Sequence, residues 1–130
     1  MENTNSINLI YKTTDETSVR LFGSTFVKNN QNNIELIING NKSKLEKEYI
    51  LNEGDNNVQL IIKNELTNLS EMFKKCNLLS NIEGLKNLNV SKCTNFKEMF
   101  SNCESLTDIK PLENWNVSNC TNFSNMFRFC

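Results

Sequence analysis

The sequence predicts an α/β chain in which a small antiparallel β domain precedes a short solenoid of 27-residue repeats. Two observations favour this fold class. The first half, residues 1–65, holds several short apolar segments separated by turn residues, a pattern typical of strands. From residue 66 onward one motif recurs at a fixed interval, at 67–76, 94–103 and 121–130. We therefore divide the chain into an amino-terminal β domain, 1–65, and a repeat region, 66–130.

About five strands are expected in the first half. The segments expected to be extended are Ile7–Tyr11, Val19–Phe22, Thr25–Val27, Ile34–Ile38, Lys42–Leu51 and Val58–Ile62. Gly23 supplies a bend and Gly54–Asn57 a turn. The dipeptide Asn39-Gly40 is a strong hairpin signal, because both residues tolerate the positive φ that a type I′ turn requires. The resulting sheet is expected to act as a cap on the repeats, because repeat arrays need atypical ends.

Each repeat is expected to begin with a short helix. Apolar side chains recur at the spacing of one helical face, as in Leu69, Met72, Phe73 and Cys76. Asn68 stands where it would cap that helix, with Glu71 three residues later, and Asn95 and Glu98 repeat the arrangement.

A short strand is expected to follow each helix, at Leu79–Ile82 and again at Leu106–Ile109. Gly84 and Pro111 then occupy equivalent turn positions. Repeats 67–93 and 94–120 are identical at about half of their columns, and 121–130 begins a third repeat. Each unit is too small to cover its own apolar face, which predicts stacking into a solenoid.

The five cysteines fall into two columns with the period of the repeat: Cys76, Cys103 and Cys130, then Cys93 and Cys120. Members of a column would stand about 4.8 Å apart on successive rungs. A disulfide needs Cβ atoms about 3.8 Å apart. We therefore expect free, buried thiols, with a disulfide framework as the alternative. Zinc is not expected, because histidine is absent and the cysteines lack the paired close spacing of zinc sites.

Composition excludes several classes of function. The net charge is −1 and no basic block is present, which argues against a nucleic-acid partner. No apolar run is long enough for a membrane span, and the start of the chain lacks the features of a signal peptide, so we expect a cytoplasmic protein. No catalytic constellation and no cofactor motif is found, so no enzyme activity and no cofactor are expected.

Two sets of residues are candidates for contact with another protein. The outward positions of the two expected strands are polar and mixed in charge: Ser80, Asn81, Glu83, Thr107, Asp108 and Lys110. They suit a protein partner, although an ordinary solvated face is the alternative. The second set lies at the far end of the repeats and comprises Phe123, Met126, Phe127 and Phe129. The chain stops ten residues into its third repeat, so we expect further repeats or a partner to cover this end.

The repeat resembles a known family. The string Met-Phe-x-x-Cys-x-x-Leu-x-x-Ile at 99–109, and Asn-Trp-Asn-Val-Ser-x-x-Thr-Asn-Phe at 114–123, are similar to BspA-like leucine-rich repeat surface proteins of mycoplasmas and protists. The resemblance covers residues 66–130. It implies a leucine-rich repeat fold, no catalytic residues, and adhesion at the cell surface as an alternative to the cytoplasm.

Function is therefore predicted to be a non-enzymatic protein–protein interaction module. One alternative is a structural subunit of a larger assembly, joined or self-associated through the far end of the repeats. The other alternative is a fragment of a cell-surface adhesion protein.

Overall fold

The computed structural model describes residues 5–130. Residues 1–4, on which the expectation about a signal peptide partly rests, lie outside the described residues. The elements are β1 (Asn5–Thr13), β2 (Thr17–Arg20), α1 (Ser24–Asn30), β3 (Ile34–Ile38), β4 (Asn41–Lys44), β5 (Glu48–Leu51), β6 (Gly54–Ile62), and the 3₁₀ helices η1 (Glu83–Asn87) and η2 (Lys110–Leu112). Within this range no helix has both the length and the apolar character needed to cross a membrane.

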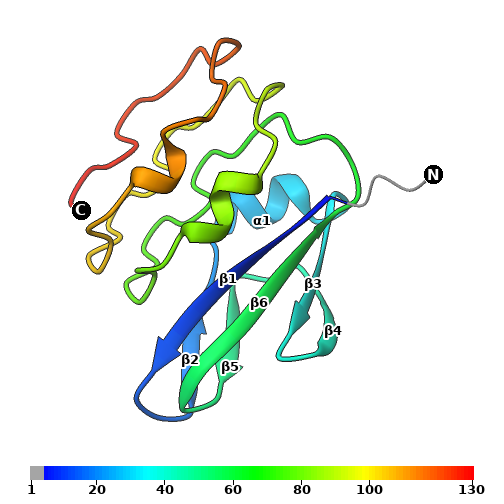
Figure 1. The fold of residues 1–130 in the computed structure, drawn as a ribbon, viewed down its shortest axis with the longest axis vertical. Coiled ribbons are helices and arrows are strands. Elements are labelled where there is room, and N and C mark those ends of the chain that lie inside the picture. Colours follow the sequence, from blue (N-terminus) through cyan, green and yellow to red (C-terminus); the bar gives the residue numbers. More distant parts are fainter. Residues whose placement is uncertain (1–4) are drawn as a thin grey trace.

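The largest sheet has four antiparallel strands in the order β1-β6-β3-β4 (Figure 1). Alternation along the strands directs one set of side chains into the core, including Leu9, Leu36 and Leu60, which are at most 1% exposed. A separate two-stranded antiparallel sheet pairs β2 with β5.

Three predicted strands are confirmed, at Ile7–Tyr11, Ile34–Ile38 and Val58–Ile62. The Asn39-Gly40 hairpin is confirmed as well. Asn39 and Gly40 have φ of 50° and 87°, and β3 pairs with β4 across them. The local signal was sufficient here because the turn type depends on the conformational freedom of these two residues.

Other expectations for the first half are wrong. Thr25–Val27 is not a strand but part of helix α1, which buries Phe26, Val27 and Asn30 on one face. The expected turn at Gly54–Asn57 is the start of β6, and Lys42–Leu51 is divided between β4 and β5. The buried Asn56 explains the longer β6, because its side chain bonds to the backbone of Asn52, Gly54 and Tyr11 and so completes the preceding turn.

The leucine-rich repeat solenoid expected for residues 66–130 is wrong. Within that range, all of which is described, there is no α-helix and no strand beyond single bridging residues. Turns occupy 70–75 and 97–102, where helices were expected, and Leu79–Ile82 and Leu106–Ile109 are not strands. The regular structure of residues 5–130 is small antiparallel β sheets, one short α-helix and two short 3₁₀ helices, rather than an α/β solenoid.

The cause is the behaviour of the asparagines that were expected to cap helices. The Oδ1 of Asn68 accepts the N–H of Ser70 at 2.9 Å, and Asn95 does the same for Lys97. Such Asx turns compete with helix formation. The chain then passes through the left-handed region at Glu71, with φ of 62°, which no α-helix allows.

The repeats are nonetheless held in register with one another by backbone hydrogen bonds. In Figure 1 they lie side by side, the green first repeat nearest the strands and the red third repeat farthest from them. Parallel bridges join Asn68 to Asn95 and Asn95 to Asn122. We use "rung" for the equivalent stretches 67–76, 94–103 and 121–130, and refer to them as the first, second and third rung.

Candidate protein-binding site

The six residues of the predicted polar face are all exposed and lie in equivalent turns of the first two repeats. Asn81 Oδ1 accepts the N–H of Glu83 at 2.9 Å, and Asp108 Oδ1 accepts the N–H of Lys110 at the same distance. These Asx turns lead directly into η1 and η2. The face is therefore set by turn chemistry rather than by strands.

A polar groove brings together half of these residues. It encloses about 370 Å³ and is lined by Glu83, Lys86, Asp108, Lys110, Pro111, Glu113 and Asn114. The Lys86 Nζ lies 2.6 Å from Glu83 Oε2, so opposite charges are paired on one wall of this groove. Asn81 lines a different groove, between β1 and η1, and bridges Ile10 of β1. Ser80 and Thr107 line neither groove.

An apolar groove adjoins the polar one and encloses about 420 Å³. Its walls are Ile109, Lys110, Leu112, Glu113, Trp115, Val117, Met126 and Phe127. Lys110 and Glu113 belong to both grooves, so the two form one surface, which we call the double groove. Trp115 is held in place because its Nε1–H donates to the carbonyl of Leu85 at 2.8 Å and its ring stacks on Phe96.

Four apolar members of this surface were not predicted as site residues from the sequence: Ile109, Leu112, Trp115 and Val117. Their counterparts in the first repeat, Ile82, Leu85, Leu88 and Val90, are at most 4% exposed. The second set occupies the same columns of the repeat, 27 residues later. It is more open because a column position is buried only where another repeat covers it. For each position in a repeat, the number of repeats that follow it could have been counted. That count would have identified these residues as the more exposed members of their columns.

The predicted set at the far end of the repeats is largely exposed. Phe123, Phe127 and Phe129 are 46%, 39% and 65% exposed, whereas Met126 is partly buried against the core. Phe127 is the last ring of a stack in which Phe22, Phe73, Phe100 and Phe127 follow one another at 5.5–5.9 Å between centroids. The outer face of this last ring has no aromatic neighbour among residues 5–130.

The five cysteines are free thiols. Cys103 Sγ–H donates to the carbonyl of Phe73 and Cys130 Sγ–H to that of Phe100, both at 3.0 Å, so the thiols bond from rung to rung. Burial raises the pKa of Cys93 to about 11 and that of Cys103 to about 12. Such thiols are poor nucleophiles at neutral pH. Across residues 5–130, no three His, Cys, Asp or Glu side chains come together as a metal site would require.

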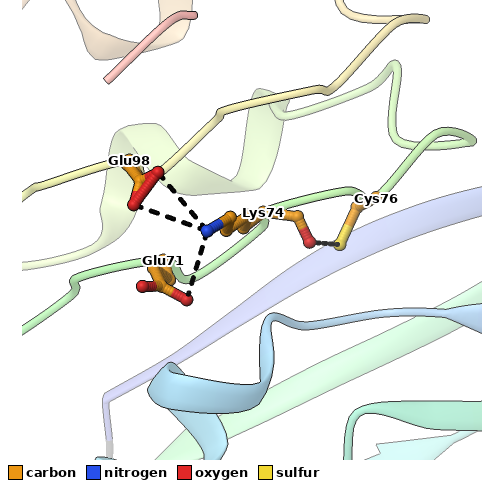
Figure 2. A network of polar contacts seen from close by, with 4 residues as sticks. All are labelled: Glu71, Lys74, Cys76 and Glu98. Atoms are coloured by element: carbon orange, nitrogen blue, oxygen red, sulfur yellow. Dashed lines mark hydrogen bonds and ion pairs between the residues drawn. The ribbon is translucent and has the colours of Figure 1, made fainter. Parts of the chain in front are cut away.

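A charged cluster joins the first two rungs beside the aromatic stack. Figure 2 shows the ammonium group of Lys74 between two carboxylates. Its Nζ lies 3.9 Å from Glu71 Oε1 and 3.3 Å from Glu98 Oε2. The three side chains are only 18–28% exposed, so they interact more strongly than surface pairs do. The two glutamates occupy the same column, and Lys74 offsets their repulsion.

Comparisons with known proteins give one match. A family model described as "Mycoplasma protein of unknown function, DUF285" matches residues 43–130. The match begins within β4 and takes in β5, β6 and all of the repeats. No curated protein and no solved structure matches the chain.

Proposed function

The chain belongs to the DUF285 family of mycoplasma proteins of unknown function, and we propose that it is a non-enzymatic protein-interaction module. The binding site is the double groove, with the rings at the far end of the repeats as its continuation. The occupant is another polypeptide.

One observation carries this proposal: an apolar floor lies directly beside a charged rim. Leu112, Trp115 and Val117 supply the floor, and Lys110 and Glu113 stand between it and the polar groove. Protein interfaces commonly have this anatomy, an apolar centre with a polar border. A buried tryptophan or other aromatic anchor often contributes most of the affinity.

The charges of the rim favour a protein over a phosphate-rich ligand. The polar groove carries Glu83, Asp108 and Glu113 against Lys86 and Lys110. Nucleic acids and anionic lipid surfaces are bound by concentrated positive charge, which this surface lacks. A partner with both charge signs around an apolar segment fits best.

A structural subunit of a larger assembly is the second candidate. The observation that favours it is the exposure of Phe123, Phe127 and Phe129 beyond the double groove. Under this alternative the same surface is permanently covered in the assembly. Size-exclusion chromatography with light scattering separates the two, because a stable monomer that binds its partner reversibly contradicts the assembly.

The relation to BspA-like surface proteins is proposed at the level of the repeat sequence alone, without a leucine-rich repeat fold. Its consequence would be an adhesion role at the cell surface. The five free thiols favour the cytoplasm, where thiols remain reduced. Protease treatment of intact cells distinguishes these locations, because only a surface protein is digested.

Site-specific photo-crosslinking tests the proposal. A photoreactive residue replaces Leu112, on the floor of the double groove, and in a matched control it replaces Lys42 on the outer strand β4. We expect Leu112 alone to capture a defined partner, and excess untagged protein should compete that capture away. Glu113→Lys should lower capture with an unchanged circular dichroism spectrum. Equal capture from both positions would contradict a binding role for the double groove.

A further inference from the structure

The Asn39-Gly40 turn, which joins β3 to β4, is also bonded to the neighbouring strand β6. The backbone N–H of Asn39 donates to the carbonyl of Asn57 at 2.9 Å, and the N–H of Asn57 donates back to Asn39 Oδ1 at 2.9 Å. The Asn39 Nδ2 donates to Asn56 Oδ1 at 2.8 Å. Both polar atoms of the Asn39 side chain are therefore engaged, although the residue as a whole is exposed.

The orientation of the Asn56 amide is fixed by its own hydrogen bonds. Asn56 is 0% exposed, and its Nδ2 donates to the carbonyls of Tyr11, Asn52 and Gly54. Its Oδ1 accepts the N–H of Asn52 at 3.0 Å in addition to Asn39 Nδ2. A half-turn of this amide would set Nδ2 against the N–H of Asn52 and remove the donor from three carbonyls, which costs free energy. Position 39 must therefore present a donor to Asn56 Oδ1.

An asparagine followed by glycine is the pair most prone to spontaneous deamidation. The backbone nitrogen of the glycine attacks the side-chain Cγ of the asparagine, and glycine is the residue that hinders this attack least because it has no Cβ. A C–N bond forms, the bond from Cγ to Nδ2 breaks, and the backbone proton leaves with Nδ2 as ammonia. Water then opens the cyclic succinimide to aspartate or isoaspartate. Of the four glycines in the chain, only Gly40 follows an asparagine.

We propose that Asn39 is a deamidation site whose reaction is controlled by the bonds of its side chain to β6. While the amide is bonded to Asn56 and Asn57, Cγ is held away from the nitrogen of Gly40, and the folded chain keeps its asparagine. Local opening of the turn releases the side chain and allows the attack. The reaction consumes only water, so it proceeds without an enzyme or a cofactor.

Conversion prevents the turn from returning to its place on β6. Aspartate at position 39 has no side-chain N–H, so a carboxylate oxygen would face Asn56 Oδ1, and these two acceptors repel each other. Isoaspartate also adds one carbon to the backbone of a turn whose geometry depends on φ of 50° and 87°. When β4 detaches, the largely apolar β3 becomes an edge strand that is open to other chains. Deamidation is thus an irreversible mark of hairpin opening.

Mass spectrometry of the full chain tests the control by the fold. Samples are kept at neutral pH, either folded in buffer or unfolded in guanidinium chloride, and the tryptic peptide 29–42 is analysed for deamidation at Asn39. We expect the reaction to be slower in the folded chain by about tenfold or more. Asn41, which is followed by lysine, is the internal control and should stay intact in both samples. Equal rates at Asn39 would overturn control by the fold, and an intact Asn39 in the unfolded chain would overturn the site.

Amide hydrogen exchange connects the reaction rate to the side-chain bonds. The N–H of Asn57, whose acceptor is Asn39 Oδ1, exchanges only when this bond opens. Its protection factor should therefore match the slowing of deamidation to within about threefold. A larger mismatch in either direction would overturn control by these bonds, because the restraint on the reaction would then lie elsewhere in the turn.

Two matched variants test the effect of the product. Asn39→Asp places the carboxylate beside Asn56, whereas Asn41→Asp adds the same charge at an exposed side chain two residues later. The readout is the protection factor of the backbone N–H of residue 39, which donates to Asn57. We expect a fall of about fivefold in Asn39→Asp and of less than about twofold in Asn41→Asp. Equal falls in the two variants would overturn the repulsion from Asn56.

Discussion

The first and third rungs are identical at six of ten positions and lie in opposite environments. Phe73 and Cys76 are fully buried in the first rung, whereas the equivalent Phe127 is 39% exposed and Cys130 is exposed in the third. The difference lies in what covers each rung. Phe22 stacks on Phe73, and the β half takes up the backbone acceptors beside it. Burial in this protein is therefore decided by the neighbour and not by the repeat sequence.

The largest expected effect is the difference between two equivalent alanine substitutions. Phe73→Ala removes a fully buried ring from the middle of the stack and should lower the free energy of unfolding by about 3–5 kcal/mol. Phe127→Ala removes a part-exposed ring and should cost about 1 kcal/mol or less. Urea denaturation of both variants measures these two losses of unfolding free energy. Equal losses would contradict the difference in burial between the two rungs.

The closed end should also be sensitive to a single added methyl group. A Cβ at Gly84 would lie 1.8 Å from the backbone oxygen of Asn8 in β1, so Gly84→Ala forces the first repeat away from the sheet. We expect a loss of about 3 kcal/mol in unfolding free energy. The control is Gly40→Ala, which meets no atom within 4 Å and carries only the strain of a positive φ, about 1 kcal/mol. A milder effect at Gly84 than at Gly40 would show that the two halves separate easily.

Buried thiols predict a loss of stability in alkali. In the folded protein burial raises the pKa of Cys103 to about 12, against an ordinary value near 9. The contribution of this buried thiol to the free energy of unfolding is complete below the pKa that it has in the unfolded chain. It declines as pH rises toward 12, at about 1.4 kcal/mol per pH unit. The free energy of unfolding, measured by chemical denaturation, should therefore fall between pH 8 and pH 10. It should fall by less in Cys103→Ala than in the native chain. An identical difference in both proteins would contradict burial of this thiol.

The smallest effect is expected from the charged cluster between the first two rungs. Lys74→Met leaves Glu71 and Glu98 without their shared cation and should cost about 1 kcal/mol in low salt. The matched control is Lys63→Met, which removes an ion pair with Glu35 whose side chains are 51% and 54% exposed. That change should cost less than about 0.5 kcal/mol. An equal loss of unfolding free energy in both variants would contradict a specific role for the cluster in the contact between rungs.

Local signals were reliable where a residue's own chemistry decides the structure. The hairpin at Asn39-Gly40 and the strands at Ile7–Tyr11 and Ile34–Ile38 follow from turn propensity and alternation, and each was predicted. The helix expected after Asn68 failed because an Asx turn and a helix cap use the same asparagine oxygen. Sequence periodicity cannot tell these two apart.

The candidate site was only partly accessible to the same reasoning. Glu83, Asp108 and Lys110 were predicted and do line one groove, but Trp115 and Leu112, which line the other groove, were not predicted as site residues. Their exposure depends on how many rungs lie beyond them, which is a property of the stack. The backbone hydrogen bonds between rungs were also beyond prediction, because they depend on the left-handed backbone at residues such as Glu98 and Asn125.

Amide hydrogen exchange at Phe73, Phe100 and Phe127 in the free monomer tests the difference between the two ends most directly. All three follow a methionine, so their intrinsic exchange rates match. The N–H groups of Phe73 and Phe100 donate to the next rung, and we predict protection by about a thousandfold or more at both. Phe127 should exchange at nearly the rate of an unstructured chain. Strong protection of Phe127 in dilute protein, or rapid exchange at Phe73, would contradict a stack that is closed at one end and open at the other.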